Sequence, residues 1–383
     1  MSARRIGANL LWLVPGVVGG SEDYTVRLLA SYADGRGEGR EQMTLFVNSA
    51  FRSAHPALVE RFPSVEAPID GARKSLRVAT EATWLAREAR ARGMDLVHHM
   101  GGNMLRTDPP GVVTIHDLQP FAHPHNFSHL KHTYLRCTVP RALRRAVLVV
   151  TLTEHTRRDV AERMEVPFER IHVVPPGITL GETARDAVEE ERVRVTYQLG
   201  THPYFIYPTI TYPHKNHITL VRAFARLAAS DPEPLLVLPA GPAGAEAALQ
   251  EEIDRLRVRR RIRRLGRIPR RDLDALIDSA TALAFPSSYE GFGIPVLEAM
   301  SRRCPVIAST ATALPEVVGD AGLLVDPYDT DGWVAAMRLL LDDPTERAEL
   351  AERGYARAGE FSWERSGAAL TAAYDAAFDR ITS

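Results

Sequence analysis

The sequence has few cysteines, no long apolar run and almost no net charge. Its 383 residues include two cysteines, Cys137 and Cys304, which do not have the spacing of a metal site. A disulfide framework is therefore not indicated, and a reducing cytoplasm fits the composition. No apolar run approaches the roughly 18–20 residues that a membrane-spanning helix requires. The net charge of −1 gives no reason to expect nucleic acid as the main partner.

Positive charge is unevenly spread along the chain, with basic stretches at residues 255–271 and 140–145. No aromatic residue interrupts the longer stretch, so binding of single-stranded nucleic acid by base stacking is not supported. A solvated helix face is the simpler interpretation. The alternative is a weak peripheral contact with the inner face of a membrane, made through these basic patches.

Short apolar runs alternate with segments of helical periodicity along the chain. The first strand is expected at residues 10–14, followed by a glycine loop at 15–20 and a helix, which is how a doubly wound α/β domain begins. A second series starts with a strand at residues 204–207, and a charged stretch places the linker near residues 178–190. The sequence thus predicts two α/β domains, residues 1–180 and 190–361, whose ligands would bind at the carboxyl ends of the strands.

The remaining expected elements follow the same alternation. Strands are expected at residues 43–47, 96–98, 112–115, 146–152, 171–174, 235–238, 262–265, 281–285, 306–308 and 322–325, and helices at 75–92, 131–145, 154–164, 217–229, 245–260, 272–279, 330–341, 345–358 and 363–380.

Residues 284–300 contain the most informative local pattern. A strand is followed by Glu290, a Gly-Phe-Gly loop and an apolar helix with Pro295 in its first turn. We expect residues 293–296 to direct free backbone N–H groups outward from the positive helix end, which suits phosphate. Glu290 and Glu298 flank this phosphate site, an arrangement that suits a nucleotide sugar. The alternative is a solvated loop carboxylate and an ordinary first-turn glutamate.

Each predicted domain has a further informative turn, directly after its first strand. In the second domain His214, Lys215 and His217 lie between strand and helix, and Lys215 could neutralise a diphosphate as a point charge or be a surface lysine. In the first domain, residues 16–20 do not complete a dinucleotide-binding fingerprint, and the acidic Glu22 and Asp23 that follow would repel phosphate. A close approach to a neutral ligand such as a sugar is favoured there.

Histidines gather at strand ends of the first domain. His116 and Asp117 leave one strand and His98 and His99 leave another, with further histidines at positions 123, 125, 129 and 132. A metal site is one interpretation, although no tight ligand pair stands out. A polar acceptor-binding surface, or solvated histidines, accounts better for the pattern. His116 is the best candidate for a contact near a reacting centre.

Taken together, these stretches resemble retaining glycosyltransferases of family 4, which have the two-domain GT-B fold. The motifs that carry the resemblance lie at residues 19–22, 114–118, 150–154, 173–178, 213–217, 265–268 and 290–298. The resemblance implies two Rossmann-like domains that face each other across a cleft. Residues 1–180 would bind the acceptor, residues 190–361 would bind the nucleotide sugar, and a helix at 362–383 would cross back to the first domain.

The resemblance also implies a role for each site residue. Glu290, Lys215 and His116 would be catalytic: Glu290 would hold hydroxyls of the donor sugar, Lys215 would neutralise the diphosphate, and His116 would contact the transferring sugar. Glu298 would bind the ribose. The remaining donor-binding residues would be Gly19, Gly20, Thr209, Arg267, Ile268, Phe292, Gly293, Ile294 and Val296, and a weaker acceptor-binding set would be His98, His99 and Asp117.

The implied reaction retains the anomeric configuration by front-face attack, with positioning and electrostatic stabilisation as the main contributions of the protein. No cofactor or divalent metal is expected. Thr209 stands where many members have an arginine that clamps the diphosphate, and His214 replaces another arginine. This variant resembles mannosyltransferases of bacterial surface polysaccharide, which favours GDP-mannose as donor and a glycan, glycolipid or secondary metabolite as acceptor. The alternatives are a GT-B-like sugar-nucleotide epimerase or hydrolase, and a metal-dependent hydrolase that uses the histidines.

Overall fold

The computed structural model describes residues 3–17, 19–35, 41–105, 108–180 and 186–382. Residue 18 of the glycine loop and residues 181–185 of the expected linker lie outside the described residues. The chain forms two compact units, one of Met1–Gly177 with Phe361–Ser383 and one of Ile178–Glu360. Among the described residues, no helix combines the length and the apolar character needed to cross a membrane.

The first unit is built on a sheet of seven strands in the order β3-β2-β1-β4-β5-β6-β7. All neighbouring strands are parallel. The strand order reverses between β1 and β4, the arrangement of a doubly wound Rossmann-like fold. The strands are β1 (Arg4–Asn9), β2 (Glu41–Val47), β3 (Ser64–Glu66), β4 (Leu96–His99), β5 (Gly111–Ile115), β6 (Leu148–Thr151) and β7 (Ile171–Val173).

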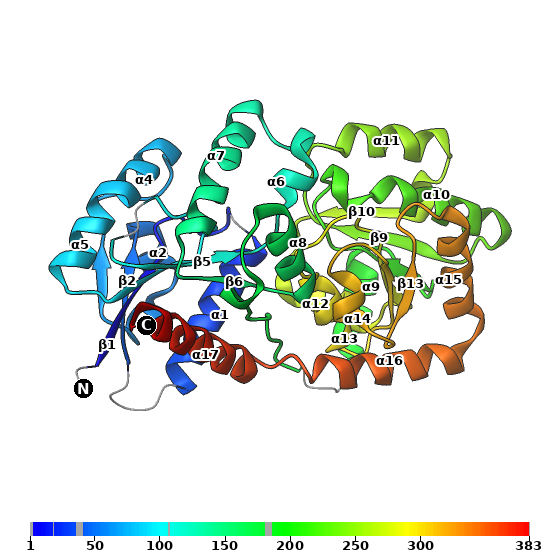
Figure 1. The fold of residues 1–383 in the computed structure, drawn as a ribbon. Coiled ribbons are helices and arrows are strands. Elements are labelled where there is room, and N and C mark those ends of the chain that lie inside the picture. The colour runs from blue at the N-terminus through cyan, green and yellow to red at the C-terminus, as the bar shows by residue number, and fades with distance from the viewer. Residues whose placement is uncertain (1–2, 18, 36–40, 106–107, 181–185, 383) are drawn as a thin grey trace. The chain divides into compact units, whose positions relative to one another are not determined.

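The last helix of the chain, α17 (Trp363–Thr382), belongs to this first unit and packs on α1 (Gly20–Gly35) and β6. In Figure 1 the red α17 lies beside the blue α1. A Cβ on Gly367 would come within 2.7 Å of Ser31 Oγ, so glycine permits this close approach. The expected return of the terminal helix is thus confirmed. The other helices of this unit are α2 (Ser49–Ala54), α3 (Pro56–Val59), α4 (Lys74–Thr80), α5 (Ala86–Ala91), α6 (Gln119–Ala122), α7 (His129–Arg145) and α8 (Glu154–Met164).

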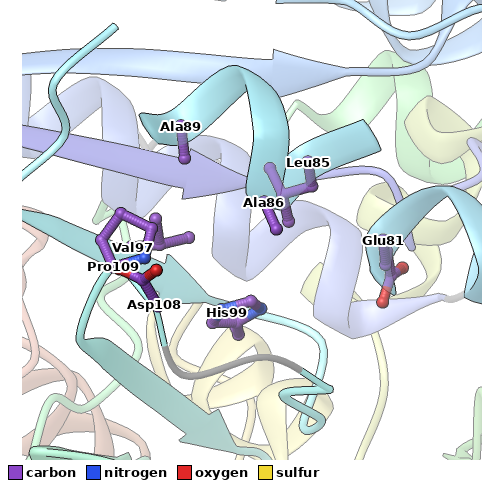
Figure 2. Close-up of a pocket in the computed structure, with 8 residues that line it drawn as sticks. All are labelled: Glu81, Leu85, Ala86, Ala89, Val97, His99, Asp108 and Pro109. Atoms are coloured by element: carbon purple, nitrogen blue, oxygen red, sulfur yellow. The ribbon is translucent and has the colours of Figure 1, made fainter. Parts of the chain in front are cut away.

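A small cavity lies beside His99 at the end of β4. It has a volume of about 10 Å³, roughly the room that one water molecule needs. Figure 2 shows His99, Glu81 and Asp108 around it, together with apolar residues of α5. Burial lowers the pKa of His99 to about 4 and raises the pKa of Glu81 to about 7. A cavity of this size cannot hold a sugar.

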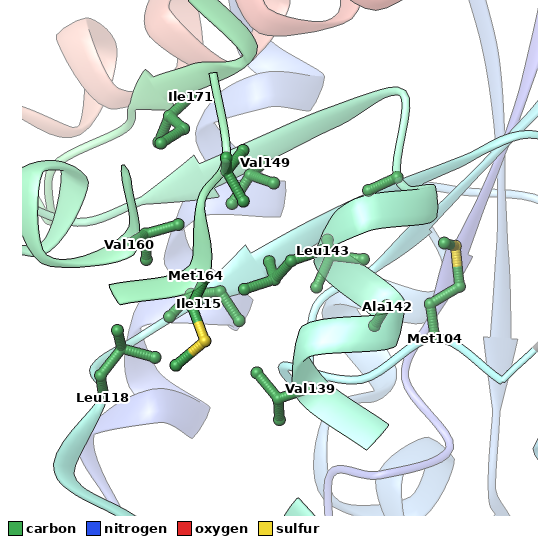
Figure 3. Close-up of a cluster of buried hydrophobic side chains, with 13 residues drawn as sticks. Met104, Ile115, Leu118, Val139, Ala142, Leu143, Val149, Val160, Met164 and Ile171 are labelled. Carbon is green, nitrogen blue, oxygen red and sulfur yellow. The ribbon is translucent and has the colours of Figure 1, made fainter. Parts of the chain in front are cut away.

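One hydrophobic cluster of the first unit lies where α7 and α8 cover β5, β6 and β7 (Figure 3). These strands read as continuous apolar runs because parallel strands of a doubly wound sheet are buried on both faces. The cluster comprises Met104, Val113, Ile115, Leu118, Val139, Ala142, Leu143, Ala146, Val149, Val160, Met164, Val166 and Ile171.

His98 lies inside this unit rather than on its surface. Its side chain is fully buried, with Nε2 2.7 Å from Thr114 Oγ1 and Nδ1 2.8 Å from the hydroxyl of Tyr374 on α17. Burial, aided by the charges of His99 and His116, lowers the pKa of His98 to about 3, so the ring is neutral at pH 7. Both ring nitrogens are engaged within the fold, and this geometry gives His98 a structural role in holding α17.

The second unit contains six parallel strands in the order β10-β9-β8-β11-β12-β13. The order reverses between β8 and β11, so the predicted second Rossmann-like domain is also confirmed. The strands are β8 (Tyr204–Ile206), β9 (Leu235–Pro239), β10 (Ile262–Gly266), β11 (Ala282–Phe285), β12 (Val306–Ser309) and β13 (Leu323–Val325). The helices are α9 (Ala187–Thr196), α10 (His217–Ser230), α11 (Glu246–Arg255), α12 (Arg270–Asp278), α13 (Ile294–Met300), α14 (Leu314–Val318), α15 (Thr330–Asp342) and α16 (Pro344–Ala358).

The expected first strand was wrong. β1 is Arg4–Asn9, and the apolar residues Leu10, Leu11 and Leu13 that follow lie buried in a turn. A continuous apolar run therefore spans the end of the strand and the turn. Helix α9 was also missed, because its charged sequence was taken as linker. The helix expected at residues 75–92 is α4 and α5 joined by a π-helical turn, Glu81–Leu85.

We expect Tyr374→Phe to lower the free energy of unfolding by about 1–3 kcal/mol, because it leaves His98 Nδ1 buried without its partner. Tyr328→Phe, at a side chain that is 67% exposed, is the control and should change nothing. Urea unfolding of both variants measures the effect. Equal stability of the two variants would contradict the structural role of His98.

Candidate functional site

Lys215 and Glu290 form an ion pair at the carboxyl edge of the second sheet. Lys215 Nζ lies 2.6 Å from Glu290 Oε1, and the two side chains are only 18% and 12% exposed. Lys215 follows β8 and Glu290 follows β11, the neighbouring strands at which the strand order reverses. This position in the sheet is where ligands of doubly wound domains bind. The structure therefore brings together two residues that the sequence proposed separately.

The two turns that carry this pair are joined by hydrogen bonds. The carbonyl oxygen of His214 accepts from the Ser288 amide at 2.7 Å and from the Ser287 hydroxyl at 3.1 Å. The Tyr207 hydroxyl donates to the carbonyl oxygen of Lys215 at 2.7 Å. Burial, together with the charge of Glu290, raises the pKa of Tyr207 well above its usual value, so Tyr207 stays a neutral donor.

Thr312 holds the backbone of Glu290 on the other side. Its hydroxyl accepts from the Glu290 amide and donates to the Glu290 carbonyl oxygen, both at 2.9 Å. Thr312 has a left-handed backbone with φ of 51°, uncommon for a β-branched residue. Thr312, Tyr207 and Ser287 were not among the predicted site residues, since no local pattern relates them to Glu290 or Lys215.

Asn216 fixes the turn between Lys215 and α10. Its backbone is left-handed, with φ of 53°, a conformation that asparagine tolerates better than most residues. Its Nδ2 donates to the carbonyl oxygens of Pro286 (3.1 Å) and Pro327 (2.6 Å). Its Oδ1 accepts from the Thr219 hydroxyl. One side chain thus links three segments around the ion pair.

The Gly-Phe-Gly loop leads into α13 as expected, but the predicted row of free amides is partly wrong. Pro295 has no N–H, and the Val296 amide donates to the Gly293 carbonyl oxygen at 2.9 Å. Within the described part of the chain, the amides of Gly293 and Ile294 have no hydrogen-bond partner. Gly293 has φ of 105°, and a Cβ there would lie 2.6 Å from Leu314 Cδ2, so only glycine fits. Phe292 is buried beside it.

Glu298 and Arg267 come from the neighbouring part of the same edge. Glu298 lies in α13 and pairs with Arg270 Nη1 at 2.6 Å; Arg270 also pairs with Asp274 at 2.8 Å. Arg267 is exposed and Ile268 half-buried in the segment between β10 and α12. A ribose at Glu298 would have to share or replace its contact with Arg270.

Thr209 brings no charge to this edge. It is buried, and its carbonyl oxygen accepts from His217 Nε2 at 3.2 Å. Burial lowers the pKa of His217 to about 3, with the positive charges of Arg264 and Lys215 acting in the same direction. His217 is therefore neutral at pH 7. Arg264 is held by two contacts of 2.7 Å to Glu246.

In the first unit, His116 lies just beyond β5. Its Nε2 is 3.0 Å from the carbonyl oxygen of Met100, so this nitrogen carries the proton and donates. Burial lowers the pKa of His116, which leaves Nδ1 of the neutral ring as a hydrogen-bond acceptor. Tyr24 packs edge-on against the ring at 5.6 Å between centroids and Trp12 packs at 5.9 Å. The ring is thus fixed in tautomer and orientation.

The other candidates of the first unit have defined surroundings. Asp117 Oδ1 accepts from the Gln119 amide at 2.9 Å, and His99 Nδ1 lies 3.3 Å from Asn9 Nδ2. Gly19 is exposed and left-handed with φ of 61°, and a Cβ there would meet no atom of the described residues within 4 Å. Gly20, the first residue of α1, is also exposed.

Glu22 is occupied in closing the glycine loop. One carboxylate oxygen accepts from the Gly16 amide at 2.7 Å, and the other lies 2.8 Å from His55 Nε2. These contacts explain why an acidic residue follows the glycines.

The histidines do not gather into a metal site: among the described residues, no group of three or more His, Cys, Asp or Glu could hold a metal ion. Five of the ten arginines at residues 255–271 pair with carboxylates, as expected for a solvated surface. The pairs are Arg255–Glu252, Arg259–Asp254, Arg264–Glu246, Arg270–Glu298, Arg270–Asp274 and Arg271–Glu189. The peripheral membrane contact stays a prediction.

Comparison with known proteins finds relatives of both halves of the chain. Residues 18–182 match the family model Glycosyltransferase Family 4, and residues 189–357 match Glycosyl transferases group 1. The O-antigen chain mannosyltransferase B of Escherichia coli is 34% identical over 254 residues, which are 66% of this chain and 67% of the relative. The MMP alpha-(1->4)-mannosyltransferase of Mycolicibacterium hassiacum is 34% identical over 63% of this chain and 57% of its own length.

Solved structures share the fold at lower sequence identity. HepE from Anabaena, in complex with UDP and glucose, superposes with a TM-score of 0.74 at 19% identity over 97% of this chain and 99% of that chain. WaaG, a glycosyltransferase involved in lipopolysaccharide biosynthesis, superposes with a TM-score of 0.70 at 18% identity, covering 96% of this chain and 98% of its own.

We expect Asn216→Ala to lower the free energy of unfolding by about 2–4 kcal/mol, since two buried carbonyl groups lose their donor and alanine is strained at this φ. Asn216→Gly removes the same hydrogen bonds without the strain, so it should cost less than Asn216→Ala. Urea unfolding compares the two. A glycine variant less stable than the alanine variant would contradict the assigned backbone constraint.

Proposed function

Given that the chain belongs to glycosyltransferase family 4, we propose that it transfers a hexose from a nucleoside-diphosphate sugar to a hydroxyl group. The acceptor would be a glycan, a glycolipid or a secondary metabolite. The observation that carries this proposal is the Lys215–Glu290 pair at the reversal of strand order in the second sheet. A cation for phosphate and a carboxylate for hydroxyls stand side by side there, as a sugar diphosphate requires.

The other residues at this edge fit the remaining parts of the donor. The amides of Gly293 and Ile294 would receive phosphate oxygens, for which backbone N–H groups are good donors. Glu298 would accept from ribose hydroxyls in exchange for its contact with Arg270. Arg267 and Ile268 would contact the base. Thr209, being uncharged, would contribute no more than a hydrogen bond to the phosphates.

GDP-mannose is the donor that we favour. Relatives named as mannosyltransferases support mannose, and the Pro213-His-Lys-Asn216 variant of the phosphate turn agrees with them. HepE, whose structure holds UDP and glucose, shares the fold, so a UDP-sugar is the second candidate.

The mechanism that fits these residues is front-face transfer with retention at the anomeric carbon. The bond from the anomeric carbon to the leaving phosphate oxygen breaks as the acceptor oxygen attacks from the same side, and the departing phosphate takes the acceptor's proton. Lys215 would stabilise the negative charge that develops on the diphosphate. Glu290 would orient the sugar through its hydroxyls. The neutral His116 offers its Nδ1 as an acceptor for a sugar hydroxyl. No metal or cofactor would be needed.

We expect transfer of mannose from GDP-mannose to a hydroxyl acceptor in a panel of nucleotide sugars, with full activity in EDTA. Mass spectrometry of the donor and of glycosylated acceptors follows the reaction, and nuclear magnetic resonance reads the anomeric configuration of the product. Loss of activity in EDTA would favour the metal-dependent hydrolase. An isomerised or hydrolysed sugar without transfer to any acceptor would favour the epimerase or hydrolase.

We expect Glu290→Ala and Lys215→Ala each to lower kcat/KM by at least about a hundredfold, since misplacing the sugar and losing a charge that stabilises the leaving group each cost this much. Glu252→Ala is the matched control, because Glu252 is a paired carboxylate on α11 of the same unit. Circular dichroism and melting temperatures verify folding. Near-normal turnover in either site variant would refute the site assignment.

A further inference from the structure

The Lys215–Glu290 pair occupies the groups that a donor must contact. Each of the two charges has the other as its ion-pair partner at 2.6 Å, and both side chains are largely withdrawn from water. A diphosphate bound to Lys215 would therefore compete with Glu290 for the three N–H donors of this ammonium group. The carboxylate then needs new hydrogen-bond donors, because a buried charge without partners is strongly unfavourable.

The backbones of both residues are held in place, so neither can move away as a segment. Lys215 is fixed through its carbonyl oxygen by Tyr207, and Glu290 is bracketed by the Thr312 hydroxyl. Only side-chain rotation can separate Nζ from Oε1. If the lysine side chain rotates, the Glu290 carboxylate stays at the same point of the sheet edge, beside the proposed diphosphate site.

We propose that this pair makes the site selective for a donor that still carries its sugar, with Glu290 as the residue that discriminates against the spent nucleoside diphosphate. The inference rests on the proposed function. Hydroxyl groups of a sugar can donate to Glu290 and replace Lys215 as its partner. A bare nucleoside diphosphate offers only anionic oxygens at this point, so it leaves the carboxylate unpaired and facing like charge.

The same asymmetry acts after transfer. Once the sugar has left with the acceptor, Glu290 loses its hydroxyl partners while the diphosphate still occupies Lys215. Re-formation of the ion pair then competes directly with the bound diphosphate for the lysine. Glu290 thus favours both the binding of intact donor and the release of the product.

Isothermal titration calorimetry of wild-type protein and Glu290→Gln with GDP and with GDP-mannose tests the inference. Glutamine keeps the size of the side chain and removes its charge, so it neither pairs with Lys215 as an ion nor repels phosphate. We expect GDP to bind Glu290→Gln about tenfold or more tightly than wild type, because a close charge pair is removed. The affinity for GDP-mannose should stay equal or fall, so that the preference for the loaded donor shrinks.

Glu252→Gln is the matched control. Glu252 is buried to a similar degree and pairs with Arg222 of α10 at 2.6 Å and with Arg255 of α11 at 2.7 Å. This variant should leave both affinities unchanged. Glu290→Ala is measured in parallel, with the same expected gain in GDP affinity, in case the glutamine variant folds poorly. UDP and UDP-glucose serve as the second pair of probes.

Unchanged or weaker binding of the nucleoside diphosphate to folded Glu290→Gln and Glu290→Ala, with wild type binding both ligands, would overturn the inference and leave the proposed function standing. Wild-type protein that binds none of the four ligands would overturn the proposed function, and the inference with it. A tenfold gain that appears equally in Glu252→Gln would also overturn the inference, because it would not be specific to the pair.

Discussion

The pairing of β8 with β11 is the constraint on which the candidate site depends. Two strands, β9 and β10, and three helices lie between them in the chain, yet they are neighbours because the strand order reverses there. Connections on either side of a reversal lead to opposite faces of a sheet, which leaves the strand ends open to a ligand. Lys215 and Glu290, 75 residues apart, meet for this reason alone. The hydrogen bonds of His214, Tyr207 and Thr312 then fix where they meet.

Local patterns were sufficient to predict much of this architecture. Continuous apolar runs such as residues 112–115 and 306–308 correspond to β5 and β12, because both faces of a parallel sheet are buried. The helix at Glu154–Met164 was predicted to the residue, and in the structure the Thr153 side chain caps its first turn. Glu290 and Lys215 were identified because each lies in a turn directly after a strand.

The errors and omissions have two sources, which are the packing of a turn and contacts between distant residues. β1 was placed too late because residues 10–13 are apolar for the packing of a turn. His98 has the sequence context of a strand-end ligand, and only its contacts with Thr114 and Tyr374, 16 and 276 residues away, give it a structural role. The sequence also did not indicate that Arg264, Arg270 and Arg271 pair with Glu246, Glu298 and Glu189. No single-sequence pattern reports these pairings, because they depend on topology.

Because Thr209 is uncharged, the proposed diphosphate site depends more strongly on Lys215. Here the position six residues before Lys215 carries no charge, and Arg264 is held by Glu246. In the proposed function, Lys215 would pair with Glu290 in the free site and with the diphosphate in the occupied one. One ammonium group cannot fully neutralise both the Glu290 carboxylate and the diphosphate. By donating to Glu290, the hydroxyls of the sugar would leave Lys215 for the diphosphate.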